Sequence, residues 1–208
     1  MKAVKNILSW VIPILVGFLI AAVIKTFFVS VVKVDGTSMY PNLQNNERVL
    51  MLHKAKIKRD SVVVFDAYGV DRNNTSLTKD TKYVKRVIAL PGDTVEYRDN
   101  GQLFVNGKFR SQGYITSQQQ VDGTLKTAAN LPKAKGVVLG TGSTFKVPKG
   151  KYFVLGDNRS VSNDSRSIHI KEPTEKCPHA KEHAVFILQK FSAKSKKALG
   201  RAFEHYFI

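Results

Sequence analysis

The N-terminal apolar run constrains this chain more than any other feature of its sequence. The segment from Ile7 to Ile24, ILSWVIPILVGFLIAAVI, contains no charged side chain. As a helix rising about 1.5 Å per residue it is about 27 Å long, close to the roughly 30 Å hydrocarbon core of a bilayer. The sequence therefore predicts one transmembrane anchor over residues 7–29, preceded by a short N-terminal segment, residues 1–6.

The charges around the run indicate its orientation. Lys2 and Lys5 precede it, and the first acidic residue of the chain is Asp35. Basic residues beside a membrane helix favour the cytoplasmic side. We therefore expect a single-pass protein of the cell membrane, with a cytoplasmic N-terminus and an extracytoplasmic domain. Two alternatives stay open: a cleaved signal peptide, with Ala21-Ala22 as a weak site, and a buried core helix.

The chain beyond residue 30 alternates between short apolar runs and turn signals. Asn106-Gly107 and similar pairs separate runs rich in β-branched and aromatic residues, a pattern typical of antiparallel hairpins. The pattern predicts a mainly β domain over residues 30–191. Residues 111–146 are polar and weakly periodic, as expected of an insertion or flexible lobe, and residues 192–208 form a basic tail. We expect strands at 27–34, 48–52, 61–65, 82–90, 94–97, 103–105, 152–155 and 184–188.

The chain is strongly basic. Its 33 lysines and arginines outnumber 16 acidic residues, which gives a formal net charge of +17. Such a balance favours an anionic partner, so contact with anionic lipids or wall polymers is one expectation and solubility alone is the other. A membrane-tethered domain that binds anionic polymers without catalysis is accordingly an alternative function. The single cysteine, Cys177, excludes an intramolecular disulfide.

Ser38 lies in a turn-like stretch, VDGTSMYPNL, soon after the apolar run. A serine hydroxyl is a poor nucleophile unless a base activates it. The G-x-S-x-G pattern of other hydrolases is not matched, because Tyr40 stands where its last glycine belongs. None of the five histidines lies in a stretch that suggests a Ser-His-Asp triad, so a neutral lysine is the candidate base.

Lys85 is the lysine that fits this description. It lies within the strand-like apolar stretch YVKRVIALPGD. Apolar surroundings disfavour the charged form of a lysine and so would lower the pKa of its amine. The alternative is an ordinary lysine on the solvent face of an edge strand. A third stretch, GDNRSVSNDSR from Gly156 to Arg166, is dense in charged and hydrogen-bonding groups and could support a catalytic pair.

Together these three stretches, in this order after one apolar helix, resemble type I signal peptidase, and Gly36 resembles the form found in Gram-positive bacteria. The resemblance implies a membrane-bound serine endopeptidase that removes signal peptides from exported preproteins after small residues at −3 and −1. It implies an antiparallel β-sheet catalytic domain with a smaller inserted β lobe, at about residues 100–146. The expected partners are preprotein signal peptides and the lipid bilayer, and no cofactor, metal or nucleic acid is expected.

The resemblance also implies roles for individual residues. Ser38 is expected to be the nucleophile and Lys85 the general base, with the backbone N–H of Ser38 binding the oxyanion. Gly36 lacks the side-chain hydroxyl that many relatives add there. Ser162 is expected to orient Lys85. The remaining expected roles are a supporting scaffold of Asp157, Asp164, Arg166 and Arg86, and a substrate-binding surface of Val32, Val34, Met39, Leu43, Tyr83 and Val84.

Some features depart from this family or suggest something else. No glycine lies between Arg166 and Gly200, so the linker over residues 167–183 is atypical of the family. Cys177, His179 and His183 are zinc-ligand residue types, but no second cluster accompanies them, so a polar loop is the favoured interpretation. Self-cleaving repressors also use a Ser-Lys dyad, but they carry a DNA-binding head where this chain has its apolar run.

Overall fold

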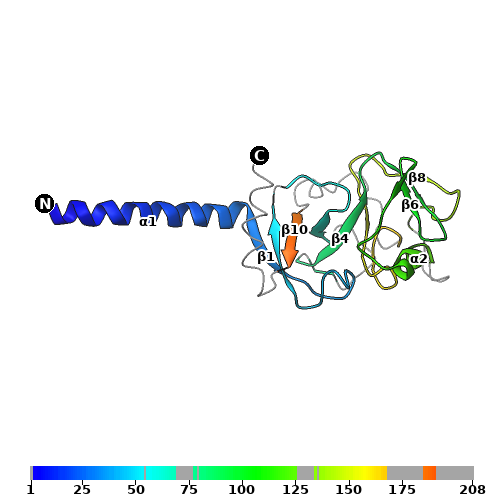
Figure 1. Cartoon of the computed structure of the whole chain (residues 1–208), viewed down its shortest axis with the longest axis horizontal. Helices are drawn as coiled ribbons and strands as arrows, with labels where there is room; N and C mark the ends of the chain where they lie inside the picture. The colour runs from blue at the N-terminus through cyan, green and yellow to red at the C-terminus, as the bar shows by residue number, and fades with distance from the viewer. Residues whose placement is uncertain are drawn as a thin grey trace.

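The computed structural model describes residues 2–53, 55–68, 77, 78, 80–125, 134, 136–167 and 185–190. A long helix, α1 (Lys2–Phe27), projects from a domain built of two β-sheets (Figure 1). Every strand pairing in this described part is antiparallel. The predicted fold class, a mainly antiparallel β domain after one N-terminal apolar helix, is therefore confirmed.

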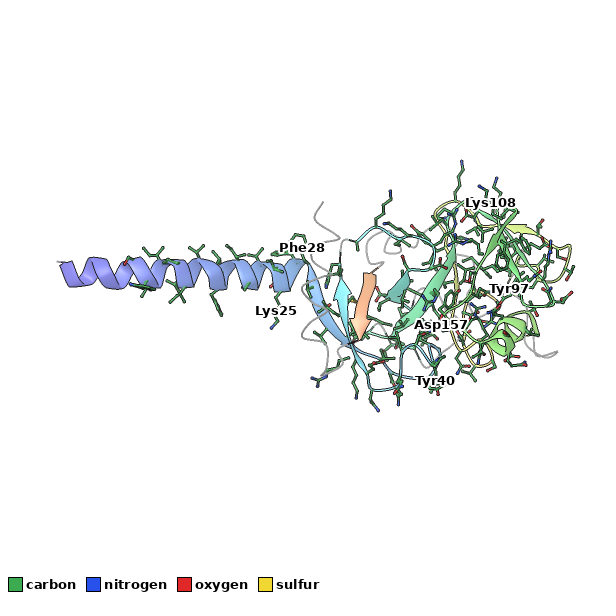
Figure 2. All side chains as sticks on the ribbon, in the orientation of Figure 1. Lys25, Phe28, Tyr40, Tyr97, Lys108 and Asp157 are labelled. Carbon is green, nitrogen blue, oxygen red and sulfur yellow. The ribbon has the colours of Figure 1, made fainter. Side chains whose placement is uncertain are left out.

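Helix α1 is long and apolar enough over Ser9–Phe27 to cross a membrane, and none of that window is buried against the rest of the described chain. Trp10 and Phe18 each expose about three quarters of their surface, at 76% and 75%. A helix that is apolar all round needs an apolar environment, either a protein core or a bilayer. Its exposure argues against the core-helix alternative. Figure 2 shows Lys25 and Phe28 where α1 meets the β domain.

The first sheet has six strands, and its order is not the order of the sequence. From edge to edge it runs β1 (Val29–Lys33), β2 (Arg48–Leu52), β10 (Val185–Lys190), β3 (Val62–Asp66), β4 (Lys82–Ala89) and β9 (Phe153–Leu155). The late strand β10 thus lies between the early strands β2 and β3 and joins them into one sheet. Strand β3 is a run of valines, and its pairing with β4 places Val63 opposite Lys85.

The second sheet has four strands in the order β7 (Lys108–Arg110), β6 (Leu103–Val105), β5 (Thr94–Tyr97) and β8 (Phe145–Lys146). Asn106 and Gly107 connect β6 to β7 with φ angles of 54° and 72°, the left-handed conformations that an Asn-Gly hairpin turn requires. A short helix, α2 (Ser117–Leu125), follows. The sequence did not predict α2, and the sheet begins before the expected lobe boundary near residue 100, a boundary that stays approximate.

The two sheets share a hydrophobic core. Ile88 and Ala89 of β4 and Leu155 of β9, all strands of the first sheet, pack with Val95 and Tyr97 of the second sheet. Apolar burial stabilises by about 25 cal/mol for each Å² removed from water, so this shared core ties the sheets together. The other half of β4 carries Lys85, and β9 leads directly into Gly156. The second sheet therefore helps to position both stretches.

Other predicted features lie outside the described residues. They are the basic tail over 192–208, most of the 167–183 linker, and the set of Cys177, His179 and His183.

Packing of α2 on the second sheet generates a test. A Cβ atom at Gly123 would lie 2.1 Å from the Tyr97 hydroxyl and 2.6 Å from its ring carbon Cζ. Replacing a mid-helix glycine by alanine normally stabilises by about 0.5–1 kcal/mol. Here we expect Gly123→Ala to destabilise by about 1–3 kcal/mol, because the buried Tyr97 has to shift. Chemical unfolding in detergent, followed by circular dichroism, measures the change.

Gly113→Ala is the matched control, because its nearest contact would be the Ser111 hydroxyl at 3.6 Å, an ordinary van der Waals distance. An unchanged or raised stability of Gly123→Ala would contradict this packing.

Candidate active site

Ser38 lies in the turn between β1 and β2, where backbone hydrogen bonds define the chain path. Tyr40 N donates to Thr37 O at 3.1 Å, and Leu43 N donates to Met39 O at 2.9 Å. Gly36 has a φ of 91°, a left-handed conformation that favours glycine, and its N–H donates to Asn45 Oδ1 at 3.0 Å. The turn therefore presents a half-buried Ser38 at a defined place on the domain.

Lys85 lies on β4, which β10 and β3 separate from β2 in the sheet, and its side chain reaches Ser38 in the turn between β1 and β2. Its Nζ lies 2.9 Å from Ser38 Oγ and 3.0 Å from the carbonyl oxygen of Val84. Lys85 is only 4% exposed, and its Nζ lies 5.1 Å from the centroid of the Tyr83 ring. The alternative of a solvent-facing lysine is therefore wrong. Sequence positions 38 and 85 are far apart, and the sheet brings their two functional groups within hydrogen-bond distance.

A cleft of about 620 Å³ lies over this pair. Its lining comes from three stretches, which are residues 32–39, Thr78 with residues 80–85, and Val161 with Asn163 of the following loop, and Ser38 and Lys85 both line it. Leu43 does not line the cleft, but packs behind it against two of the lining residues, Val34 and Met39. The expected substrate-binding residues that do line the cleft are Val32, Val34, Met39, Tyr83 and Val84.

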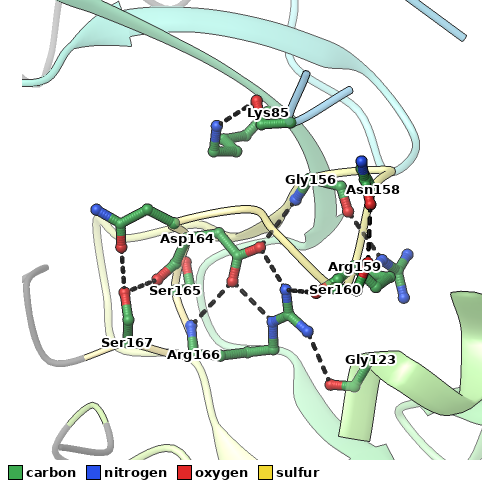
Figure 3. A network of polar contacts seen from close by, with 12 residues as sticks. Lys85, Gly123, Gly156, Asn158, Arg159, Ser160, Asp164, Ser165, Arg166 and Ser167 are labelled. Carbon is green, nitrogen blue, oxygen red and sulfur yellow. Dashed lines mark hydrogen bonds and ion pairs between the residues drawn. The ribbon is translucent and has the colours of Figure 1, made fainter. Parts of the chain in front are cut away.

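The loop from Gly156 to Arg166 is organised by a buried ion pair. Arg166 Nε and Nη2 donate to the two carboxylate oxygens of Asp164, each at 2.8 Å, and Gly156 N donates to Asp164 Oδ2 at 3.0 Å (Figure 3). Burial disfavours the charged carboxylate of Asp164, but the charge and hydrogen bonds of Arg166 outweigh it and hold its pKa below the usual value. The expected Asp164–Arg166 pair is thus present.

Gly156 brings this loop against the turn that carries Ser38, residues 34–43. A Cβ atom at this position would lie 2.2 Å from Ser162 Oγ and 2.5 Å from the carbonyl oxygen of Ser38, so only glycine fits. Ser162 is buried, at 3% exposure, and its hydroxyl helps to lower the pKa of Asp164. Ser162 therefore lies close to the turn that carries Ser38, and its expected role in orienting Lys85 stays a prediction.

A second buried pair joins Asp157 to Arg86, the residue after Lys85. Arg86 Nε and Nη2 donate to the two carboxylate oxygens of Asp157 at 2.8 and 2.6 Å. Burial disfavours the charged guanidinium of Arg86, but the hydrogen bond and charge of Asp157 outweigh it and raise its pKa. Asn42 Nδ2, from the turn that carries Ser38, donates to Asp157 Oδ2 at 2.8 Å. Asp157 is fully buried, and Figure 2 labels it near the middle of the domain in that view.

Several residues outside the predicted site also support this region. Arg159 is fully buried, and its guanidinium donates to neutral groups: the Tyr97 hydroxyl, Gln112 Oε1 and the carbonyl oxygen of Gly156. Its place within GDNR was a signal that it belongs to the scaffold. Asn42 and Gln119 carried no comparable signal, because amide side chains in turns and polar helices are common.

Comparison with known proteins identifies the family. The model of the family described as signal peptidase, peptidase S26, matches residues 7–183. Signal peptidase IB of Staphylococcus aureus strain COL is 37% identical over 172 residues, covering 78% of this chain and 81% of that protein. Signal peptidase I of Bacillus licheniformis is 36% identical over 168 residues, covering 78% and 80%.

Among solved structures, a signal peptidase I from Enterococcus faecalis V583 is 29% identical to this chain. The match covers 65% of this chain and 98% of that one, with a TM-score of 0.39. The family model spans most of the sequence and includes both residues 38 and 85. The chain belongs to the signal peptidase family, peptidase S26, whose members remove signal peptides from preproteins.

Proposed function

We propose that this protein is a membrane-anchored serine endopeptidase that removes signal peptides with a dyad of Ser38 and Lys85. The observation that carries the proposal is the 2.9 Å distance between Lys85 Nζ and Ser38 Oγ at the cleft. Burial of the lysine disfavours its charged form, and only a neutral amine can accept the serine proton.

The proposed reaction has two halves. Lys85 Nζ takes the hydroxyl proton while Ser38 Oγ attacks the scissile carbonyl carbon, and a tetrahedral oxyanion forms. When this intermediate collapses, the C–N bond breaks and Lys85 returns the proton to the leaving amine of the mature protein. Water then attacks the acyl-enzyme, again with Lys85 as base, and releases the signal peptide from Ser38.

The oxyanion needs hydrogen-bond donors where the charge develops. We assign the backbone N–H of Ser38 to this task. Gly36 has no side-chain donor, and its own N–H already donates to Asn45 Oδ1. The proposed oxyanion site therefore depends on the orientation of the peptide group between Thr37 and Ser38.

The apolar walls of the cleft support cleavage after small residues at −3 and −1. Val32 and Val84 are only partly buried and pack on the cluster that contains Val34 and Met39. In the proposal, these side chains accept alanine-like residues at −3 and −1 and exclude larger ones. Leu43 supports the wall from behind.

The membrane helix completes the proposal. Helix α1 ends at Phe27, next to β1, so the cleft stays within a few tens of ångströms of the bilayer surface. With Lys2 and Lys5 at the cytoplasmic end, the catalytic domain would lie outside the cytoplasm, where signal peptides emerge. Contact of the basic chain with anionic lipids or wall polymers is part of the same proposal.

The dyad is tested by removing each functional group. We expect Ser38→Ala and Lys85→Met each to lower kcat/KM by at least about a hundredfold, since a positioned base contributes about 10²–10⁴ to the rate. Cleavage of a preprotein with an Ala-x-Ala site, in detergent micelles, is the measurement. Ser111→Ala and Lys108→Met, at exposed positions of the second lobe, are the controls. Wild-type rates in Lys85→Met would exclude the lysine as base.

The role of the cleft walls is tested by shortening a wall side chain, which enlarges the cleft. Val84→Ala should reduce discrimination between alanine and leucine at −3 or −1 by about tenfold or more, because one or two methylene groups in an apolar pocket change relative rates by about 10–200-fold. Competition between two preproteins that differ at one position measures the ratio. Val138→Ala, 48% exposed and not among the residues lining the cleft, is the control. An unchanged ratio would remove Val84 from the specificity site.

The buried scaffold is tested by acid and by substitution. The pKa of Asp164 is lowered in the folded protein, so the stability it contributes is present above its unfolded pKa of about 3.9. That stability is lost as pH falls through the lower folded value. Asp164→Asn should cost about 3–5 kcal/mol at neutral pH, because it leaves the Arg166 charge buried and unpaired. The loss should shrink toward acid pH.

Asp66→Asn is the matched control for this experiment. It breaks the exposed ion pair with Lys82, whose side chains are 41% and 46% exposed, and should cost less than about 1 kcal/mol. Unfolding midpoints measured from pH 7 down to pH 3 compare the two variants. Equal losses in both would contradict the buried role of Asp164.

A further inference from the structure

We propose that Gln119 of α2 is a positioning residue for catalysis, which acts through Asn158 on the peptide group between Thr37 and Ser38. The inference rests on the proposed function, because it assigns that peptide N–H to the oxyanion. The proposed role of Gln119 links the second sheet and α2, which contribute no residue to the dyad, to the N–H group that would stabilise the transition state.

Asn158 holds the turn that carries Ser38 by hydrogen bonds to two consecutive carbonyl groups. Its backbone N–H donates to Ser38 O at 3.0 Å, and its side-chain Nδ2 donates to Thr37 O at 3.2 Å. The Thr37 carbonyl and the Ser38 N–H belong to one planar trans peptide, so they point in opposite directions. The donors that fix the Thr37 carbonyl, which are Asn158 Nδ2 and the backbone N–H of Tyr40, therefore also fix the direction of the Ser38 N–H.

Gln119 and Ser160 together determine which way the Asn158 amide faces, because the Ser160 hydroxyl also donates to Asn158 Oδ1, at 3.1 Å (Figure 3). The backbone N–H of Arg159 donates to Gln119 Oε1 at 2.6 Å, and Gln119 Nε2 donates to Asn158 Oδ1 at 3.3 Å. A backbone N–H can only donate, so it requires the oxygen of the Gln119 amide on its side. The Gln119 amino group then faces Asn158 and requires the oxygen of that amide. Asn158 Nδ2 is thereby left to face Thr37.

The helix that carries Gln119 is itself held by buried side chains. Arg166 Nη1 donates to the carbonyl oxygen of Gly123 at 3.1 Å, a contact visible in Figure 3. The Tyr97 hydroxyl donates to the carbonyl oxygen of Gln120 at 2.7 Å. Both anchors are buried, at 3% exposure for Arg166 and 0% for Tyr97. Gln119 thus acts from a fixed support, as a positioning group requires.

The consequence is specific to the transition state. Removing the Gln119 amide would leave the exposed Ser160 hydroxyl as the only described donor to Asn158 Oδ1, so the Asn158 side chain would rotate more freely and the Thr37–Ser38 peptide would loosen. The oxyanion forms only in the transition state, whereas the signal peptide is bound by the apolar walls of the cleft. We therefore expect kcat to fall while KM stays nearly unchanged.

The test is a double-mutant cycle with preprotein cleavage as readout. Gln119→Met keeps the length of the side chain and removes both hydrogen bonds, and we expect kcat to fall between about twofold and tenfold, as for one hydrogen bond. Gln118→Met is the matched control: Gln118 is exposed in the same helix and bonds only the neighbouring Asp122 side chain among the contacts described. It should cleave at the wild-type rate.

The cycle adds Asn158→Ala with and without Gln119→Met. If Gln119 acts through Asn158, Gln119→Met lowers kcat in the wild-type background and has no further effect in Asn158→Ala. An equal effect in both backgrounds would mean that Gln119 only stabilises the lobe, and would overturn the proposal. Gln119→Glu, which keeps the acceptor for Arg159 N–H and loses the donor to Asn158, should behave like Gln119→Met and replaces it if that variant does not fold.

The outcomes distinguish failure of the proposed function from failure of the role proposed for Gln119. If wild-type cleavage does not depend on Ser38, the proposed function fails and this inference with it. If cleavage depends on Ser38 but Gln119→Met and Gln118→Met have equal kcat values, only the role of Gln119 is wrong.

Discussion

The burial of the Lys85 amine beside the Ser38 hydroxyl is the constraint on which the rest of the structure depends. An amine in an apolar environment is stable only when it is uncharged or well paired. The groups around Lys85 therefore have to be apolar or already paired with other residues. Val63 lies opposite it in the sheet, and the valines of the cleft wall pack nearby. The two buried carboxylates of the neighbouring loop each form an ion pair with an arginine, Asp157 with Arg86 and Asp164 with Arg166.

The second sheet takes part in this construction. Its core includes Ile88 of β4 and Leu155 of β9, so the strands that lead to Lys85 and to Gly156 are packed from both sides. Arg166 reaches from the loop to α2, and Arg159 reaches to Tyr97 in β5. A lobe that looks like an insertion in the sequence is therefore part of the support for the site. In the proposed mechanism, this lobe also acts on the turn that carries Ser38, through Gln119 and Asn158.

Several elements could be predicted because their signals are local. The apolar run predicted α1, the valine-rich runs predicted β3 and β4, and the Asn-Gly pair predicted the turn between β6 and β7. Helix α2 was missed because SQQQVDGTL has no apolar face and contains a mid-helix glycine, both unfavourable signs. Strands β7 and β8 were missed because they are short and because KFR and FK each contain a single apolar residue, whereas the equally short β6 and β9 are wholly apolar.

The sequence by itself determined the apolar helix, the β class of the domain, the family and the identity of the expected catalytic pair, because these depend on residue types and their order. Only the tertiary structure decided that Lys85 is buried rather than solvent-facing and that its amine lies within 3 Å of Ser38. It alone decided that Gly156 must be glycine and that Asn42 and Gln119 contact the loop from Gly156 to Arg166. These outcomes depend on strand pairing and loop packing between residues distant in the chain, which no local pattern encodes.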